Sequence, residues 1–189
     1  MQQNSDKLPE IIVFAGPNGS GKSTIIKMAK IIEPYIKADD IKRTNYCSDL
    51  EAAQLAEKLR ENAILDKRSF TFEMVLSTER NLNLLKRAKK QGYFIRCIYV
   101  LTSNVNVNIM RVRSRETLGG YGVPEDKIRS RYEKDFKLIK ELVEISDVVH
   151  VYDNTITPFR IFKKRKSEYF FWENDMWNEE SIRDLVGVK

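Results

Sequence analysis

Residues 10–24 read EIIVFAGPNGSGKST, a strand-like run followed by a glycine-rich loop. The first six residues are mostly β-branched or aromatic, which is typical of a short, fully buried strand. The loop matches GxxxxGK[ST] at every fixed position, namely Gly16, Gly21, Lys22 and Ser23. A helical pattern follows from Lys22 to about Ile32. A strand, a glycine-rich loop and a helix in this order predict a phosphate-binding loop.

This loop has the chemistry needed to hold nucleotide phosphates. Its glycines let backbone N–H groups turn inward around phosphate oxygens, and the following helix points its positive end at the same place. Lys22 adds a charge near the β and γ phosphates, the Ser23 hydroxyl can ligate Mg²⁺, and Thr24 can donate to a neighbouring phosphate. We therefore expect ATP with Mg²⁺ rather than an ordinary strand-to-helix turn. The candidate residues are Gly16, Pro17, Asn18, Gly19, Ser20, Gly21, Lys22, Ser23 and Thr24.

Four further strand-like segments alternate with helical patterns along the chain. Strands are expected at about residues 35–38, 69–75, 93–101 and 147–152, and helices at 49–67, 78–91, 103–116 and 124–145. Such alternation is typical of a parallel sheet covered by helices on both faces. The predicted class is α/β, a P-loop NTPase three-layer sandwich with a mostly parallel five-stranded sheet.

The pattern changes after Asn154. Residues 1–154 are expected to form the core, with a lid around residues 109–131. Residues 155–189 are expected to be a small C-terminal extension packed on the same domain, with a β-hairpin at the sheet edge and a helix from about residue 175. The Lys163–Lys166 run is expected to be a solvated turn, although it could also contact nucleic acid.

Composition and charge exclude several classes of protein. The chain has 189 residues, and 33 Lys and Arg against 27 Asp and Glu give it a net charge of +6. That charge favours anionic partners but is modest for a dedicated nucleic-acid binder. The apolar run Ile11–Ala15 is far shorter than the roughly 20 residues of a membrane span, and residues 1–10 lack the apolar segment of a secretory signal. We therefore expect a cytoplasmic protein with no membrane contact.

The cysteines and the histidine give no sign of metal or triad chemistry. Cys47 and Cys97 belong to no CxxC or Cys/His cluster, so we expect two free thiols. The sole histidine, His150, lies in the apolar run Val148–Val151. It is expected at the edge of the core rather than in a catalytic triad.

Three carboxylates follow predicted strands at the end of the sheet where the phosphate loop lies. Asp39 and Asp40 come after the second strand, and Glu73 lies near the end of the third. Ligands of open parallel sheets bind at this end. One carboxylate could take the proton of an acceptor hydroxyl while the others hold the acceptor or Mg²⁺. The two aspartates could instead cap a short helix, whereas a buried Glu73 needs a partner.

Five arginines surround a second glycine-rich loop, residues 119–122. Arg111, Arg113 and Arg115 precede it, and Arg129 and Arg131 follow it. Arg111 and Arg115 share one helix face, whereas Arg113 points elsewhere and is expected on a solvated face. Two arginine-bearing helices joined by this loop would form a lid able to close on the γ-phosphate.

Several classes of phosphate-loop protein can be excluded. The chain has no guanine-reading NKxD and no LSGGQ-like signature, and the predicted strand 93–101 ends in Leu101 and Thr102 without an acid. The class of small-molecule kinases remains.

The order of these motifs resembles the zeta toxin family of P-loop kinases, in particular its short single-domain members. The resemblance covers about residues 10 to 154. It rests on the segments 14–24, 38–41, 70–77 (FTFEMVLS), 111–115, 119–124 (GGYGVP), 128–132 (IRSRY) and 153–154.

The resemblance implies an adenylate-kinase-like fold and ATP-dependent phosphorylation of a small hydroxyl-bearing acceptor. In the family's toxins the acceptor is the 3′-hydroxyl of a UDP-N-acetyl amino sugar, and a proteinaceous antitoxin masks the nucleotide site. The family's catalytic base maps onto Asp39, and the glutamate that holds the acceptor maps onto Glu73. Its two transition-state arginines map onto Arg115 or Arg111 and onto Arg129 or Arg131.

The chain departs from the family pattern at two places. Met74 and Val75 stand where short members usually carry two threonines, and Tyr121 stands where they carry a histidine. The first change removes hydroxyls beside Glu73. Two alternatives to a small-molecule kinase stay open: a polynucleotide or RNA-end kinase, and an ATP-binding regulatory protein without catalysis.

Overall fold

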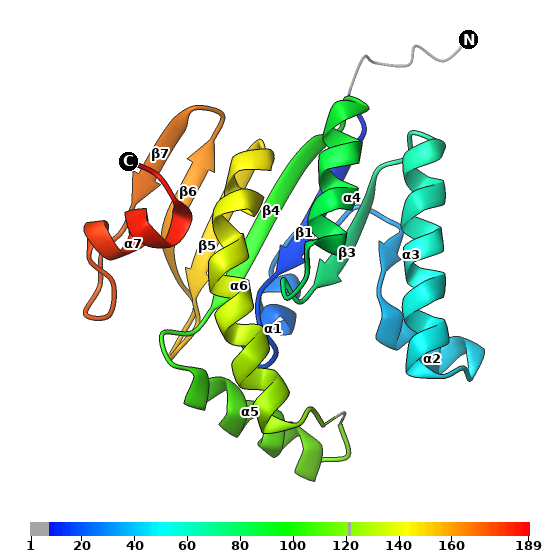
Figure 1. The fold of residues 1–189 in the computed structure, drawn as a ribbon, viewed down its shortest axis with the longest axis horizontal. Helices are drawn as coiled ribbons and strands as arrows, with labels where there is room; N and C mark the ends of the chain where they lie inside the picture. The colour runs from blue at the N-terminus through cyan, green and yellow to red at the C-terminus, as the bar shows by residue number, and fades with distance from the viewer. Residues whose placement is uncertain (1–7, 121) are drawn as a thin grey trace.

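A seven-stranded sheet forms the centre of the structure, a computed structural model that describes residues 8–120 and 122–189 (Figure 1). The order across the sheet is β2-β3-β1-β4-β5-β6-β7. The strands are β1 (Glu10–Ala15), β2 (Tyr35–Ile36), β3 (Phe70–Met74), β4 (Phe94–Leu101), β5 (Val148–Asp153), β6 (Phe159–Arg165) and β7 (Glu168–Phe171). The helices are α1 (Lys22–Ile26), α2 (Ala38–Asn45), α3 (Asp49–Leu65), α4 (Glu79–Lys90), α5 (Val105–Thr117), α6 (Glu125–Ile145) and α7 (Glu179–Val186).

The five parallel strands are those predicted. β1 pairs with β3 on one side and with β4 on the other, β2 pairs with β3, and β5 pairs with β4. Every residue of β1 is buried. A central parallel strand has neighbours on both edges and cover on both faces, which explains its unbroken apolar sequence.

The sheet has two more strands than predicted, because the C-terminal hairpin joins it. β6 pairs antiparallel with β5 over the whole of β5, and β7 pairs antiparallel with β6. Lys163, Lys164 and Arg165, expected in a turn, belong to β6. The turn is shorter and consists of Lys166, with φ 56°, and Ser167.

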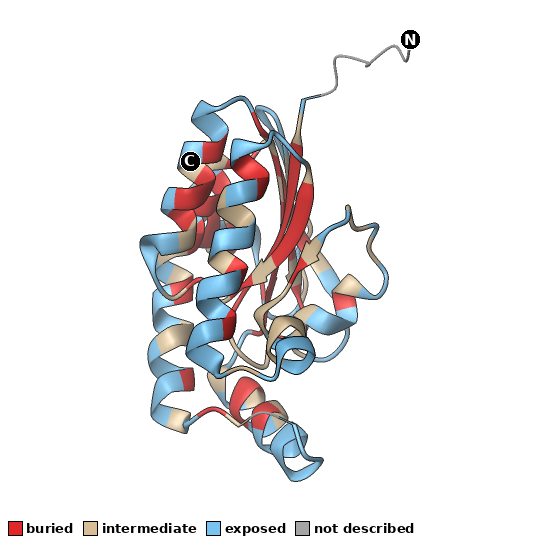
Figure 2. Cartoon of the chain, turned by 90° about the vertical axis from the view of Figure 1, so that its right-hand side faces the viewer, coloured by how far each residue is buried: buried red, intermediate tan, exposed pale blue. Residues whose placement is uncertain are grey.

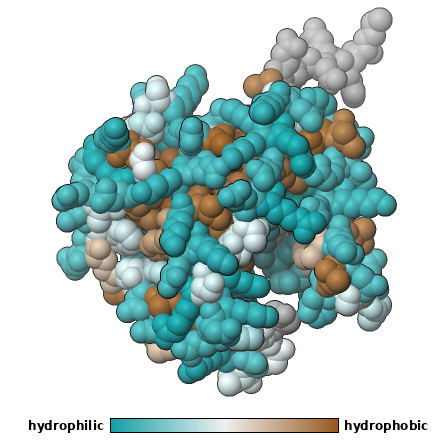
Figure 3. All heavy atoms as spheres, in the orientation of Figure 1, coloured by the Kyte–Doolittle hydropathy of each residue, from teal (hydrophilic) through white to brown (hydrophobic). Residues whose placement is uncertain are grey.

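The two faces of the sheet are covered unequally. α3, α4, α6 and α7 lie on one face, and their outer surface is mostly hydrophilic (Figures 1 and 3). The main apolar core lies beneath them and includes Ile182, Leu185 and Val186 of α7. On the other face, α1 and the segment that follows it cover a smaller cluster around Ile12 and Ile98 (Figure 2).

α1 is shorter than predicted, because the chain leaves the helix to reach β3. It ends at Ile26 rather than near Ile32. The backbone of Ile32 exchanges two hydrogen bonds with the hydroxyl of Thr71, at 2.8 and 2.7 Å. The carbonyl of Pro34 accepts from the Thr71 amide at 3.0 Å. These bonds satisfy backbone groups that a longer helix would have used.

Most other helix ends lie near the predicted positions. Ser48 and Glu51 form a capping box at the start of α3. Asn104 caps α5, which begins at Val105 rather than at residue 103. α2, which follows β2 directly, was not predicted as a separate helix. Among residues 8–120 and 122–189, no helix is both long enough and apolar enough to cross a bilayer.

α5 and the start of α6 form the predicted lid region below the carboxyl end of the sheet (Figure 1). Their contact is a separate apolar cluster of Ile109, Val112, Val123 and Ile128. The lid region therefore has a small core of its own. Tyr121, at the centre of the second glycine-rich loop, lies outside the described residues.

Candidate active site

A cavity of about 630 Å³ opens beyond the carboxyl ends of β1 and β3. It is lined by the phosphate loop on one side, by the ends of β2 and β3 on another and by α5 and α6 on the third. The lining side chains that carry charge are Lys22, Lys37, Asp39, Glu73, Arg111, Arg115 and Arg131. The fold thus brings together residues up to 113 positions apart in the sequence.

Two asparagines from distant elements fix the shape of the phosphate loop. Asn108 Nδ2 donates to the carbonyl of Asn18 at 2.6 Å, and Asn154 Nδ2 donates to the carbonyl of Ser20 at 2.9 Å. Both asparagines are buried. Paired in this way, the loop carbonyls are held and do not compete with a ligand for the inward-facing N–H groups.

Glycine is required at Gly19 and Gly21 because these asparagines approach so closely. Both glycines have a positive φ, 79° and 89°. A Cβ on Gly19 would lie 2.4 Å from the Asn108 carbonyl oxygen, and one on Gly21 would lie 2.1 Å from Asn154 Nδ2. In this chain, a larger residue at either position would therefore collide with the asparagine beside it.

Lys22 lies along the loop with its ammonium group turned back on it. Its Nζ donates to the carbonyls of Gly16 at 2.7 Å and Pro17 at 3.1 Å. Burial lowers the pKa of Lys22, and the negative charges of Glu73 and Asp135 oppose that shift. Ser23 and Thr24 are exposed in the first turn of α1.

Two buried polar atoms beside the loop have no partner. They are the Oγ of Ser20 and the Nη1 of Arg111, whose Nη2 donates to the Thr155 carbonyl at 3.1 Å. An unpaired buried donor is costly, and a guanidinium is a strong partner for phosphate oxygens. This arrangement fits a phosphate group against the loop.

The acidic residues separate into two environments. Asp39 is exposed at the cavity in the first turn of α2, and the half-buried Glu73 lines the cavity from the end of β3. The Tyr35 hydroxyl donates to Glu73 Oε2 at 3.1 Å, and Lys37 Nζ lies 3.6 Å from its Oε1. Burial and the Glu73 charge raise the pKa of Tyr35. Asp40 pairs with Arg43 at 3.1 Å and does not line the cavity.

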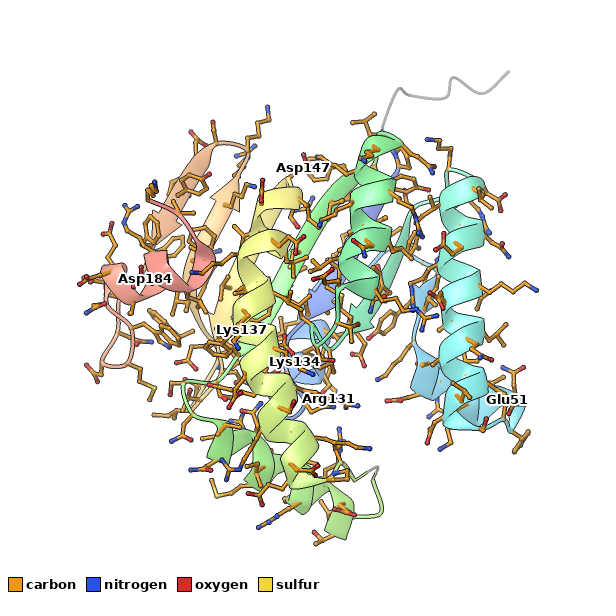
Figure 4. The ribbon with its side chains drawn as sticks, viewed as in Figure 1. Glu51, Arg131, Lys134, Lys137, Asp147 and Asp184 are labelled. Atoms are coloured by element: carbon orange, nitrogen blue, oxygen red, sulfur yellow. The ribbon has the colours of Figure 1, made fainter. Side chains whose placement is uncertain are left out.

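The lid arginines also separate into two groups. Arg111, Arg115 and Arg131 line the cavity, and Arg131 Nη1 donates to Asn18 Oδ1 at 3.1 Å from the start of α6 (Figure 4). Arg129 does not line it, because its side chain bonds to Glu125 and Asn106 on the outer side. Arg113 is exposed and also pairs with Glu125, as expected of a solvated face.

Asp135 is a buried acid that the sequence did not indicate. It lies on α6 with no exposed surface, and Tyr99 donates to its Oδ1 at 3.3 Å. Burial raises its pKa to about 7, and the charge of Lys22 and the hydrogen bond from Tyr99 oppose the shift. Its position continues the apolar stripe of α6, so the pattern gave no signal for an acid in the core.

The residues of the site fit a magnesium ion that is bound together with nucleotide phosphates. Among the described residues, no cluster of three or more His, Cys, Asp or Glu could hold a metal. Mg²⁺ commonly uses one or two protein ligands and completes its shell with phosphate oxygens and water. The exposed Ser23 hydroxyl beside the loop fits that arrangement.

Comparisons with known proteins agree with this architecture. No protein-family model matches the chain. An uncharacterised protein of Haemophilus influenzae is 29% identical over 127 residues, which are 64% of this chain and 91% of that protein. A solved structure from the PezAT chromosomal toxin–antitoxin system of Streptococcus pneumoniae has a TM-score of 0.61 at 18% identity, covering 96% of this chain and 85% of that one.

A second solved structure is the AvrRxo1-ORF1:AvrRxo1-ORF2 complex, with a TM-score of 0.66 at 12% identity. The match covers 96% of this chain but 64% of that one, so the chain spans under two thirds of its length. The same complex has also been solved with ATP. These similarities show that the chain shares the α/β fold of these two structures over almost its whole length.

Proposed function

We propose that the chain is an ATP-dependent phosphotransferase of zeta-toxin type, which moves the γ-phosphoryl group to a hydroxyl of a small acceptor. One observation carries this proposal. A single cavity has the phosphate loop with Lys22 on one wall and the carboxylates of Asp39 and Glu73 on the other. A kinase needs donor phosphates and an acceptor hydroxyl in one water-poor space.

On the donor side, the loop amides and Lys22 bind the phosphates of ATP. Bound Mg²⁺, held by Ser23 and phosphate oxygens, supplies charge neutralisation there. Lys22 is well suited to move toward a phosphate, because its ammonium group now bonds only to two loop carbonyls. Arg111 offers its unpaired Nη1 to the same group.

On the acceptor side, Asp39 acts as the general base. It takes the proton of the acceptor hydroxyl as that oxygen forms a bond to the γ-phosphorus, and the bond to the β–γ bridging oxygen breaks to release ADP. Glu73, held by Tyr35 and Lys37, positions the acceptor. Arg115 and Arg131 stabilise the charge of the transferring group from the lid side.

The proposed acceptor is a UDP-N-acetyl amino sugar. One part of the cavity wall, however, is less polar than that acceptor requires. Met74 and Val75 line the cavity beside Glu73 where hydroxyl side chains would bond to a sugar. The chain therefore offers that acceptor fewer hydrogen bonds, and a less polar alcohol fits this wall as well.

We also propose a protein partner of the antitoxin kind. The support is that one neighbour comes from a toxin–antitoxin system and another is a two-component complex. Co-expression with the product of an adjacent gene, followed by a phosphotransfer assay, tests this. Inhibition that is lost when the partner is removed supports it, and full activity of the co-purified complex contradicts it.

Phosphate transfer measured by mass spectrometry tests the main proposal. The purified chain is incubated with ATP, Mg²⁺ and UDP-N-acetylglucosamine, other nucleotide sugars or 5′-hydroxyl oligonucleotides, and ADP release is followed in parallel. A product heavier by one phosphoryl group is expected. Asp39→Asn should lower turnover by about 10²-fold or more, the range for loss of a general base, and leave ATP affinity nearly unchanged.

Each other outcome selects a different function. Phosphorylation of oligonucleotides alone would favour an RNA-end kinase, a reading supported by a TM-score of 0.53 to a Pnkp1/Rnl/Hen1 RNA repair complex at 16% identity. ATP binding without acceptor-dependent ADP release would favour a regulatory protein. Undiminished turnover of Asp39→Asn would remove the assigned base.

A further inference from the structure

The sheet face opposite the four covering helices is open over β5 to β7. Among the described residues, α1 and the segment after it cover this side over β1 and β4 (Figure 2). Paired residues of neighbouring strands point to the same side, so the register gives the side chains on this face. We call it the basic–aromatic face; it consists of Arg96, His150, Tyr152, Arg160, Lys163, Phe170 and Trp172.

Cations and rings alternate on this face in direct contact. The guanidinium of Arg160 lies 4.3 Å from the ring centroid of Trp172, and Lys163 Nζ lies 5.4 Å from that of Phe170. The rings of Phe170 and Trp172 are 6.3 Å apart and within 23° of parallel. Cross-strand pairing thus arranges flat apolar surfaces and positive charges in one row.

The positive charge of this face is partly compensated. Arg96 pairs with Glu10 at 2.8 Å, and Glu168 lies on the same face opposite Arg165, but Arg160 and Lys163 have no ion pair among the described residues. Burial and the charges of Arg160, Lys163 and Arg96 lower the pKa of His150 to about 4. Arg160 and Lys163, which have no acidic partner here, give the face a positive local potential that attracts anions.

A hollow of about 620 Å³ borders the basic–aromatic face at His150 and Tyr152. Its walls include the apolar side chains of Ile12, Ile25 and Ile98, and Arg96 and Tyr152 line it as well. This volume is within the range of small-molecule binding clefts, about 300–1,000 Å³. A planar apolar group of a larger ligand could enter it while the ligand's charges remain on the surface.

We infer that the basic–aromatic face binds single-stranded nucleic acid. Unstacked bases pack on the rings of Phe170 and Trp172 and on the guanidinium plane of Arg160, and backbone phosphates lie against Arg160 and Lys163. Open sheet faces with aromatic and basic side chains bind single strands by this combination, with little sequence preference. This site is separate from the phosphotransfer cavity and does not depend on the function proposed above.

Two competing occupants would use only part of the face. The bases of a duplex are already stacked on each other, so a duplex could reach the cations but not the rings. An acidic polypeptide would also satisfy the cations, with no requirement for a flat ring beside them. The dependence of binding on the rings therefore separates a single strand from both.

Fluorescence anisotropy with a labelled 12-nucleotide oligo(U) at low salt tests the rings. Phe170→Ala is expected to weaken binding about tenfold, the scale of losing one stacked base. Tyr169→Ala is the matched control, because the two residues are neighbours in β7 with 41% and 42% exposure, and Tyr169 stacks on Phe162 at the opposite face. The control should bind as the unaltered chain does.

The salt dependence of the same binding tests the cations. Lys163→Gln should make the slope of log affinity against log salt concentration shallower, by the contribution of about one phosphate contact. Lys137→Gln removes the same charge from α6 on the opposite side of the molecule, where Figure 4 labels it, and should leave the slope unchanged. Thermal unfolding of each variant checks that the fold is retained.

Trp172→Phe keeps a flat ring and provides a readout that does not rely on loss of affinity. Trp172 and Trp177 are the chain's two tryptophans, and Trp177 is buried with its Nε1 bonded to Asp153 at 2.9 Å. Oligo(U) should quench the intrinsic fluorescence of the unaltered chain, whereas Trp172→Phe should bind without that quenching. Equal effects of Phe170→Ala and Tyr169→Ala, tighter binding of a duplex, or no binding at low salt would overturn the inference.

Discussion

The two walls of the phosphotransfer cavity are built in opposite ways. The phosphate loop is held by buried amides, with Gly19 and Gly21 in contact with Asn108 and Asn154. The lid wall carries Arg111, Arg115 and Arg131 on two helices that contact each other through a separate small apolar cluster. The loop is tied to the main fold through Asn154 and to the start of α5 through Asn108, whereas the rest of the lid is expected to open locally at a lower free energy than the main core.

Because of this difference, substitutions in the loop and in the lid should have different effects on nucleotide binding and turnover. Changes in the loop should affect nucleotide binding and turnover together, because the loop is pre-organised before any ligand arrives. Changes in the lid should affect turnover most, because in the proposed function the lid arginines act on the transferring group. Four predictions test that division.

Lys22→Met should have the largest effect. It removes the charge at the donor phosphates and keeps the apolar stem, so phosphotransfer should fall by about 10³-fold. Stability should change little, because burial of the ammonium group already opposes its charged form. Steady-state turnover and thermal unfolding measure the two effects, and the exposed Lys27→Met serves as control. A variant with near-normal turnover would show that the loop does not bind the reacting phosphates.

Arg115→Ala should come next, with turnover lowered by about 10²-fold and ATP affinity almost retained. The reason is that Arg115 lines the cavity from the lid and contributes to the field at Lys22. Arg113→Ala, two residues away on the outer side, should leave turnover within about twofold, the effect expected of a surface ion pair. Equal losses in both variants would mean that the lid is needed only for folding.

The phosphate loop could be predicted from sequence because its geometry depends on neighbouring residues. Gly16 to Ser23 are contiguous, and the strand before them is buried on both faces, so consensus and composition agree. The parallel strands could be predicted for the same reason, because each is a contiguous apolar segment. Asp39 and Glu73 could be assigned to the cavity because strand ends of a parallel sheet lie at one edge.

The supports of the loop could not be predicted, because their partners are far away in the chain. Asn108 and Asn154 bond to residues 90 and 134 positions distant. The early end of α1 depends on a hydroxyl 39 residues away, at Thr71. The sequence offers Arg129 and Arg131 as equal candidates, and their partners distinguish them, because Arg129 bonds to Glu125 and Asn106 whereas Arg131 bonds to Asn18.

Asp135→Asn should change how stability depends on pH. The carboxyl has a pKa of about 7 in the folded chain against 3.8 as its ordinary value. Between these values the unfolded chain has lost a proton that the folded chain keeps, so the free energy of unfolding decreases as pH rises toward 7. Between pH 5 and 7.5 this amounts to about 2 kcal/mol, which Asp135→Asn should remove.

Denaturant unfolding of both chains at the two pH values measures this difference. The pKa of His150 is lowered to about 4, so its titration decreases the free energy of unfolding as pH falls below 6.5, which is the opposite direction. His150 is present in both chains, so its effect cancels when the two are compared. Asn keeps the shape of the side chain and can still bond to the Tyr99 hydroxyl. Parallel pH profiles for the two chains would show that Asp135 is ionised in the folded protein across this range.

The smallest effect should come from the lid's own core, and it tests the comparison most directly. Val112 and Val149 are 1% and 0% exposed, one in the lid cluster and one in the main core. Valine to alanine removes the same two methyl groups at each, worth about 1.5 kcal/mol. Val149→Ala should lower the global free energy of unfolding by that amount. Val112→Ala should instead mainly speed hydrogen exchange in α5 and the start of α6, because the lid region can open without unfolding of the main core. If the two variants lowered global stability equally with no local increase in exchange, the lid would unfold only together with the loop, and the two walls of the cavity would be one cooperative unit.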